Sequence, residues 1–267
     1  MVRSAADRAF LPAKSLFEQV GDMMILTAKT IVSAIRPPYP YGGEFIGQFL
    51  FALQLCWFPM MISTLAFGFG APGLQAANFL SLFGALDRLG GFFVLASIRE
   101  FAPFVTAVVV AGVAGTAITA DLGARKIREE LDARMVLGID PIQRLVVPRV
   151  LATMIVAVFL NGLVSVVGVA GGYVFNVILQ DGTPGAYLAS FTALAQLPDL
   201  WQGMAKALVF GLIAAIVACY KGMNAAGGPK GVGDAVNEAV VITFMLLFVV
   251  NFVMSAIYFQ LVPPKTG

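Results

Sequence analysis

The sequence contains no histidine and only two cysteines among its 267 residues. Without histidine, the commonest side chain for acid–base catalysis is missing, and so are Ser-His triads and nearly all zinc sites. Cys56 and Cys219 each lie within an apolar run, so we expect neither a disulfide framework nor a Cys-x-x-Cys site. The absence of histidine and the scarcity of cysteine argue against a histidine-dependent enzyme, a zinc protein and a domain stabilised by disulfides.

A phosphate-binding loop of the form G-x-x-x-x-G-K-[ST] is also missing from the sequence. The glycine-rich stretch 227–231 lacks that spacing, and we interpret it as a turn between two apolar segments. We therefore expect no cofactor in this chain. If ATP drives this protein, another chain must bind and hydrolyse it.

Charge is scarce as well. Charged residues make up 12% of the chain and hydrophobic residues 59%, whereas a soluble domain carries roughly 25% charged residues. A soluble protein of this composition has too few polar residues to cover its surface. The net charge of +2 is too small to indicate a nucleic-acid partner. The composition predicts an all-α integral membrane protein.

Five long apolar runs predict about five transmembrane helices, because one span takes roughly 20 residues. The runs cover residues 44–70, 92–120, 150–180, 203–220 and 238–262. Gly168 and Gly172 in the third run have the GxxxG spacing of closely approaching helices. Residues 71–91 are mixed, and we expect either an outer loop with a short helix or a re-entrant segment.

The N-terminal segment has a helical rather than a signal-peptide pattern. Phe10, Phe17, Met24 and Ile31 recur every seven residues, and charged residues fall on the other side. This predicts an amphipathic helix that lies in the membrane interface, with packing on a soluble partner as the alternative. We expect two parts: an N-terminal interfacial helix at 1–40 and a transmembrane domain at 41–267.

The distribution of basic residues predicts the orientation. If the N-terminus is cytoplasmic, 13 of the 17 Lys and Arg residues lie on the cytoplasmic side, and the exceptions are Arg88, Arg99, Lys206 and Lys265. The positive-inside rule therefore favours a cytoplasmic N-terminus and an odd number of spans. We expect a multi-pass protein of the plasma (inner) membrane.

The most charged segment is 121–149, with eleven charged residues in 29 positions. Residues 123–137 are expected to form one short helix with Ile127, Leu131 and Met135 on its apolar side. Gly138 suits the position after the C-terminus of this helix, and Asp140 suits the N-cap of the next. The segment is either a solvated loop that sets topology or a docking helix for a cytoplasmic partner.

Seven short motifs follow one another along the chain. They are REFAP at 99–103, AGVAGTA at 111–117, EELDA at 129–133, GIDP at 138–141, VPR at 147–149, GMNA at 222–225 and GVG at 231–233. Over about residues 40–262 the chain resembles the MlaE/YrbE permeases of Mla and Mce (mammalian cell entry) lipid transport systems. In its overall sequence character the chain is similar to actinobacterial YrbE subunits. Many relatives carry arginine where this chain has Val113, so a role for that arginine does not carry over.

The resemblance implies a set of partners. These are a second permease subunit, usually an unlike YrbE chain, a cytoplasmic ABC ATPase dimer, a hexameric ring of MCE proteins and membrane lipids. ATP and Mg are expected in the ATPase, with none in this chain. The EExDA motif marks the expected ATPase-coupling residues, which are Ile127, Glu129, Glu130, Leu131, Asp132, Gly138 and Asp140.

The resemblance also places Arg99 and Glu100 near the outer mouth of a lipid cavity. Phe45 and Phe101 complete the candidate cavity. The alternative is that Arg99 and Glu100 pair or snorkel at the headgroup boundary, since charged groups near a span are costly. Asn161 and Asn251 are expected to form hydrogen bonds between helices.

The function implied by the resemblance is the permease subunit of an ABC-type MCE lipid transporter. It would move fatty acids, sterols or phospholipids across or out of the plasma membrane, driven by a separate ATPase, and would not itself be an enzyme. The alternatives are an ATP-independent secondary transporter or channel for a hydrophobic solute, and an intramembrane enzyme. The sequence offers no nucleophile–base pair or ligand cluster that would favour the enzyme.

Overall fold

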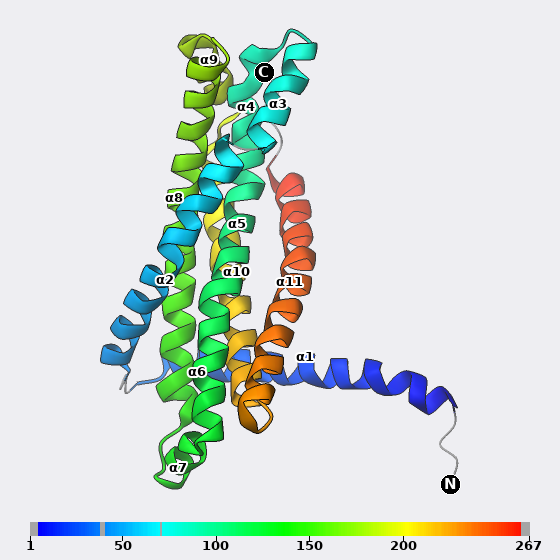
Figure 1. Cartoon of the computed structure of the whole chain (residues 1–267), viewed down its shortest axis with the longest axis vertical. Helices are drawn as coiled ribbons and strands as arrows, with labels where there is room; N and C mark the ends of the chain where they lie inside the picture. The colour runs from blue at the N-terminus through cyan, green and yellow to red at the C-terminus, as the bar shows by residue number, and fades with distance from the viewer. Residues whose placement is uncertain (1–4, 38–40, 70, 263–267) are drawn as a thin grey trace.

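The computed structural model describes residues 5–37, 41–69 and 71–262, and every regular element in that part of the chain is a helix. Five helical segments are long and apolar enough to cross a membrane: Gly42–Ala66, Leu86–Ile127, Ile142–Leu179, Leu197–Met223 and Gly228–Leu261. They form a tall bundle (Figure 1). The prediction of an all-α, multi-pass membrane protein with five spans is confirmed.

The spans are built from the following elements. The first is α2 (Gly42–Phe69). The second joins η1 (Leu86–Arg88), α4 (Leu89–Phe93), η2 (Val94–Phe101), α5 (Ala102–Val109), η3 (Val110–Gly115) and α6 (Thr116–Ile127). The third joins η4 (Ile142–Val146), α8 (Val147–Val174) and η5 (Phe175–Leu179). The fourth is α10 (Leu197–Met223) and the fifth is α11 (Gly228–Leu261).

The predicted boundaries of the spans were too narrow. The second helix begins at Leu86 and the fifth at Gly228, well outside the uncharged runs. Both helices therefore include charged residues at their starts, Asp87 and Arg88 in the second and Lys230 and Asp234 in the fifth. Residues 71–91 form α3 (Ala71–Leu82) and the start of the second helix, in agreement with a short outer helix.

The bundle is centred on α8 and α10, and α2, α6 and α11 pack around them. Small residues bring the helices close together. A Cβ at Gly211 of α10 would lie 3.0 Å from the Ala157 Cβ of α8, and one at Gly172 would lie 2.6 Å from the Phe93 ring. One at Gly168 would overlap Ser97. The predicted close approach at Gly168 and Gly172 is therefore confirmed.

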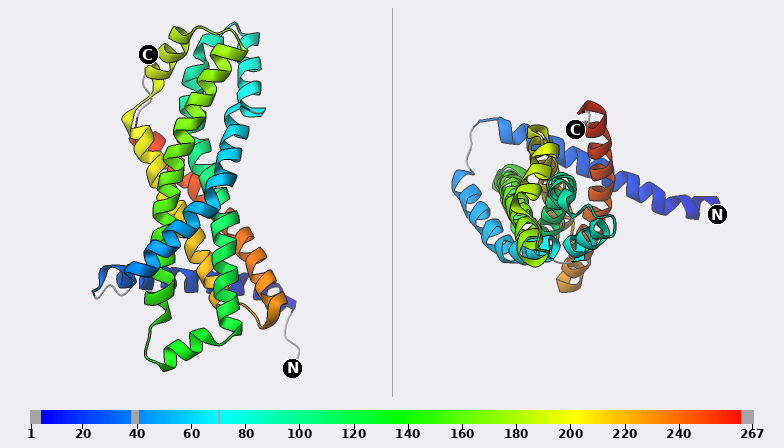
Figure 2. Two further views of the ribbon diagram at one scale, coloured as in Figure 1. Left: turned by 60° about the vertical axis from the view of Figure 1, so that its left-hand side comes forward. Right: turned by 90° about the horizontal axis from the view of Figure 1, so that it is seen from above.

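Helix α1 (Ala5–Ile35) lies across one end of the bundle, nearly at right angles to the spans (Figures 1 and 2). Met23 and Leu26 are buried in the bundle core, whereas Met24, Ile31 and Ile35 are exposed. The helix is therefore amphipathic, as predicted. Phe10 and Phe17 lie outside the side chains that the structure describes, and the interfacial location and the division at residue 40 stay predictions.

Candidate functional site

The charged segment between the second and third spans is folded, but as two helices rather than one. Helix α6 ends at Ile127 and α7 covers Glu130–Val136. Between them Glu129 adopts a left-handed conformation, with φ of 58°. Such a backbone costs about 1–3 kcal/mol in a residue other than glycine. The prediction of one continuous helix at 123–137 was wrong, because the left-handed backbone at Glu129 interrupts the helix.

Both predicted ends around Gly138 are confirmed. Gly138 has φ of +74°, its N–H donates to Met135 O at 3.0 Å, and the Ile139 N–H donates to Arg134 O at 3.0 Å. This pair of hydrogen bonds is a Schellman motif. Asp140 Oδ1 then accepts the Ile142 N–H at 2.9 Å, which caps the start of the third span. The short connection is thus held at both ends.

The apolar surface of α7 differs from the predicted one. Leu131 is only 4% exposed and packs in the chain's own core with Leu122 and Leu145, so it is not available to a partner. Ile127 is 40% exposed, but the most exposed apolar side chains are Val136 and Leu137 at 87% and 74%. Sequence reasoning missed these two because it assumed that the helix ran unbroken from residue 123.

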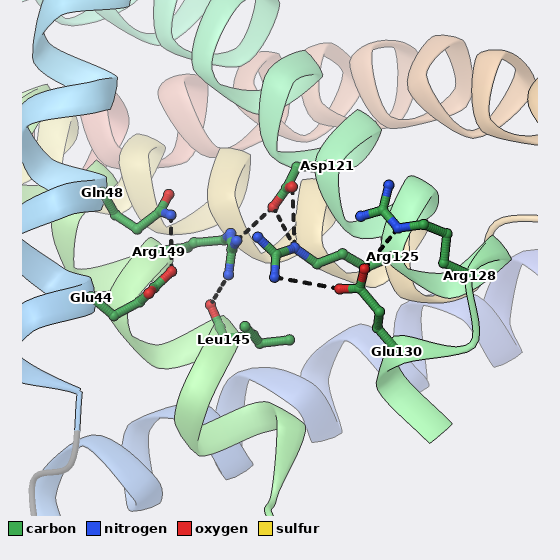
Figure 3. Close-up of polar contacts among 8 residues, drawn as sticks. All are labelled: Glu44, Gln48, Asp121, Arg125, Arg128, Glu130, Leu145 and Arg149. Carbon is green, nitrogen blue, oxygen red and sulfur yellow. Dashed lines mark hydrogen bonds and ion pairs between the residues drawn. The ribbon is translucent and has the colours of Figure 1, made fainter. Parts of the chain in front are cut away.

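A network of charges ties α7 to both neighbouring spans (Figure 3). The side chain of Arg149 is only 1% exposed and donates to Asp121 Oδ2 at 2.6 Å and to Leu145 O at 2.8 Å. Arg125 pairs with the same Asp121 at 3.1 Å and with Glu130 at 3.7 Å. Asp121 therefore joins the end of the second span to the start of the third.

The acids of the EExDA motif are mostly paired within the chain. Glu130 pairs with Arg128 at 2.7 Å, and Asp132 pairs with Lys126 at 3.1 Å. All four of these side chains are between 37% and 59% exposed. Because exposed pairs are worth at most about 1 kcal/mol, a partner's charges can replace them at little cost.

A second polar cluster lies between the second, fourth and fifth spans. Arg99 and Asp199 form an ion pair at 2.7 Å, with 8% and 2% of their side chains exposed. The Tyr258 hydroxyl donates a hydrogen bond to Asp199. The Arg99 guanidinium lies 5.7 Å from the centre of the Tyr258 ring. Asp199 also caps α10 by accepting the Gln196 N–H at 2.9 Å.

The adjacent Glu100 has its own partners. Lys206 Nζ donates to Glu100 Oε1 at 2.9 Å, Ser255 Oγ donates to the same oxygen at 2.8 Å, and Asn251 Nδ2 donates to Glu100 Oε2 at 3.1 Å. Lys206 is fully buried. The predicted interhelical role of Asn251 is thereby confirmed, but the same prediction was wrong for Asn161, whose buried side-chain amide has no hydrogen-bond partner among the described residues. Sequence reasoning did not identify Asp199 and Lys206 as site residues. The one sign of them in the sequence is that two charged residues lie near the start of the fourth span.

The structure does not bring together the four residues of the predicted lipid cavity. Phe101 lines a cavity of about 20 Å³ between the second and third spans, with Phe93 and Val105. A space of that size holds about one water molecule, not a lipid. Phe45 lies in the first turn of α2, at the end of the bundle that α1 crosses (Figure 1). Its ring stacks on that of Phe49. Its distance from Arg99 follows from the chain direction, since α2 starts at the end where the second span finishes.

The comparison with known families agrees with this arrangement. The model of the permease MlaE family matches residues 45–257, which is every span from the start of the first to near the end of the fifth. The chain belongs to the MlaE permease family. It is therefore a transporter subunit of the ABC permease type and a multi-pass membrane protein.

Relatives support the same assignment. A probable ABC transporter permease of Synechocystis sp. is 41% identical over 187 residues, covering 70% of this chain and 71% of the relative. One of Rickettsia bellii is 34% identical over 245 residues, covering 92% and 94%. The chloroplastic protein trigalactosyldiacylglycerol 1 of Arabidopsis thaliana is 35% identical over 191 residues, covering 70% of this chain and 53% of the relative.

Proposed function

We propose that this MlaE-family chain is the membrane-spanning, non-catalytic subunit of an ABC-type MCE lipid transporter. It works with a second permease, an ABC ATPase dimer that binds ATP and Mg, and a hexameric MCE ring. It lies in the plasma (inner) membrane with its N-terminus in the cytoplasm. The main support for this proposal is the position of α7. At the end of the bundle that α1 crosses, α7 projects beyond α1 (Figure 1).

Helix α7 is suited to pass motion from an ATPase to the spans. Its exposed Val136 and Leu137 offer an apolar contact, and Glu129 and Glu130 offer charge. Its base is held by the buried Leu131 and by the Asp121–Arg149 ion pair. A push on α7 therefore moves the second and third spans together.

The lipid is proposed to occupy a space between two permease subunits. The faces of α2 and α11 that point away from the bundle are apolar, and only 22% and 11% of their span windows are buried. A buried acyl chain gains about 0.8 kcal/mol per CH₂, so such a cavity needs few polar contacts. Of the second polar cluster, Glu100 is open to a headgroup because 38% of its side chain is exposed, whereas Arg99 and Lys206 are buried.

The buried ions also favour a second candidate, an ATP-independent transporter for a hydrophobic solute. Intramembrane ion pairs are typical of proton- or ion-coupled transport. The two proposals differ in their energy source. Lipid transfer that requires ATP and the ATPase subunit supports the first, and transfer that follows a proton gradient without ATP supports the second.

The decisive experiment changes the tip of α7. Val136→Asp should leave the chain inserted and folded, because the side chain is 87% exposed, yet it should abolish recovery of the ATPase on copurification and lipid transfer in proteoliposomes. Burying a charge in an apolar contact without a partner is costly. The control is Lys230→Asp, which introduces an aspartate at another exposed position, in the first turn of α11. Normal ATPase recovery and transfer with Val136→Asp would contradict the proposal.

A further inference from the structure

A pocket separate from both clusters lies where α1 crosses the start of the third span. Its volume is about 570 Å³. One wall comes from the end of α1, with Lys29, Val32 and Ser33, and from Arg36 just after it. The other comes from the entry to the third span, with Asp140 and Ile142. The two walls are separated by more than 100 residues of chain, so the pocket exists only in the folded protein.

Charge in this pocket is predominantly positive. Lys29 lies on α1 and Arg36 directly follows its last residue, seven positions further on, with Ser33 between them, and both are exposed. Neither forms an ion pair with a described residue. The one acid, Asp140, accepts the Ile142 N–H at 2.9 Å and is thereby held by the positive end of the helix it caps. Two cations that form no ion pair with any described residue therefore face this space.

The depth of the pocket limits the kind of anion that it meets. Helix α1 lies across the bundle, with Met23 and Leu26 buried against it and Met24, Ile25 and Ile35 exposed. In its predicted interfacial location α1 runs parallel to the membrane plane at one edge of the bilayer, because the spans stand nearly at right angles to it (Figures 1 and 2). Lipid phosphates occupy that level. Val32 and Ile142 add apolar surface beside the cations, which suits the first carbons of an acyl chain.

We propose that this pocket binds the headgroup of an anionic phospholipid, with its phosphodiester between Lys29 and Arg36. The lipid is a resident ligand that ties α1 to the start of the third span, and it is distinct from the transported lipid of the cavity between subunits. Basic pockets beside membrane helices take acidic headgroups by the same combination of charge and depth. Because Asp140 directly follows the turn at Gly138, the bound lipid also steadies the base of the α7 segment.

Native mass spectrometry of the full-length chain in detergent tests this site. Dioctanoyl phosphatidylglycerol is titrated against dioctanoyl phosphatidylcholine and against glycerol 3-phosphate, a phosphate monoester without acyl chains. The wild-type chain should retain phosphatidylglycerol in preference to the other two. Lys29→Gln/Arg36→Gln should bind it about thirtyfold more weakly, from a loss of about fivefold for each surface cation.

Two controls separate the pocket from general charge. Arg88→Gln/Lys230→Gln removes the same net charge elsewhere and should keep wild-type binding, and Lys29→Arg/Arg36→Lys keeps both cations and should also bind. If the double variant folds poorly, Arg36→Gln alone replaces it in the titration, and its affinity for phosphatidylglycerol should fall several-fold. Equal loss in the Arg88/Lys230 control, unchanged binding in the Lys29/Arg36 variants, or equal binding of phosphatidylcholine or glycerol 3-phosphate would overturn the proposal. Each result is independent of ATPase recovery, so it stands apart from the proposed transport function.

Discussion

The two ion clusters of this protein differ in how deeply they lie. In the α6–α7–α8 cluster, Arg149 is buried, but its partner Asp121 and most of the other charges are between a quarter and three fifths exposed. In the cluster between the second, fourth and fifth spans, Arg99, Asp199 and Lys206 are all nearly inaccessible. Exposed pairs are screened and exchange partners easily, whereas buried pairs are costly to break. The first cluster is therefore suited to a moving contact and the second to a permanent joint.

Asp199→Asn tests the permanent joint and should have the largest effect. It leaves the Arg99 guanidinium buried without a counter-charge, which typically costs about 3–5 kcal/mol in the free energy of unfolding. The readout is the thermal unfolding midpoint of the chain in detergent. Arg99→Met/Asp199→Leu should recover much of the loss, since apolar replacement of a whole buried pair is often neutral. A midpoint near that of the wild type for Asp199→Asn would remove the distinction between the two clusters.

Asp121→Asn tests the one place where the exposed cluster reaches the interior. The buried Arg149 loses its charged partner but keeps its hydrogen bond to Leu145 O at 2.8 Å. Because a hydrogen bond to a charged group is worth about 1.5–3 kcal/mol, we expect a loss of about 2 kcal/mol. Asp234→Asn, at an exposed position near the start of α11, is the matched control for removal of a carboxylate. A loss as large as that of Asp199→Asn would show that depth is not what separates the clusters.

Lys126→Gln should have the smallest effect. It breaks only the pair with Asp132, whose side chains are 37% and 48% exposed. The expected loss is under about 1 kcal/mol and should shrink further at high salt, because exposed charges are screened. Thermal midpoints at low and high ionic strength measure it. A larger loss that is independent of salt would mean that α7 is a fixed part of the bundle.

Sequence reasoning succeeded where local chemistry decides the outcome. The five apolar runs become five spans because any such run must bury its backbone polar groups in helices within lipid. Gly138 and Asp140 end and begin helices as predicted, since left-handed φ and N-capping depend on single residues and their neighbours. The stripe of apolar residues on α1 was likewise readable from its spacing.

The failures share a different cause. The bend at Glu129, the burial of Leu131 and the separation of Phe45 from Arg99 all depend on what lies across the bundle. Arg99 was recognised as a candidate, but its partner Asp199 is 100 residues away and was not. Spacing along one helix carries no information about a partner on another.

The amino-acid sequence by itself therefore determined the membrane environment, the number of spans, the helix ends around Gly138 and the family resemblance. Each of these follows from composition, from a period along one segment or from the identity of a few neighbouring residues. Only the tertiary structure decided which charges meet, which apolar side chains of α7 remain exposed and that α1 closes a basic pocket with the third span. Those features depend on contacts between distant segments, and such contacts exist only once the helices have packed.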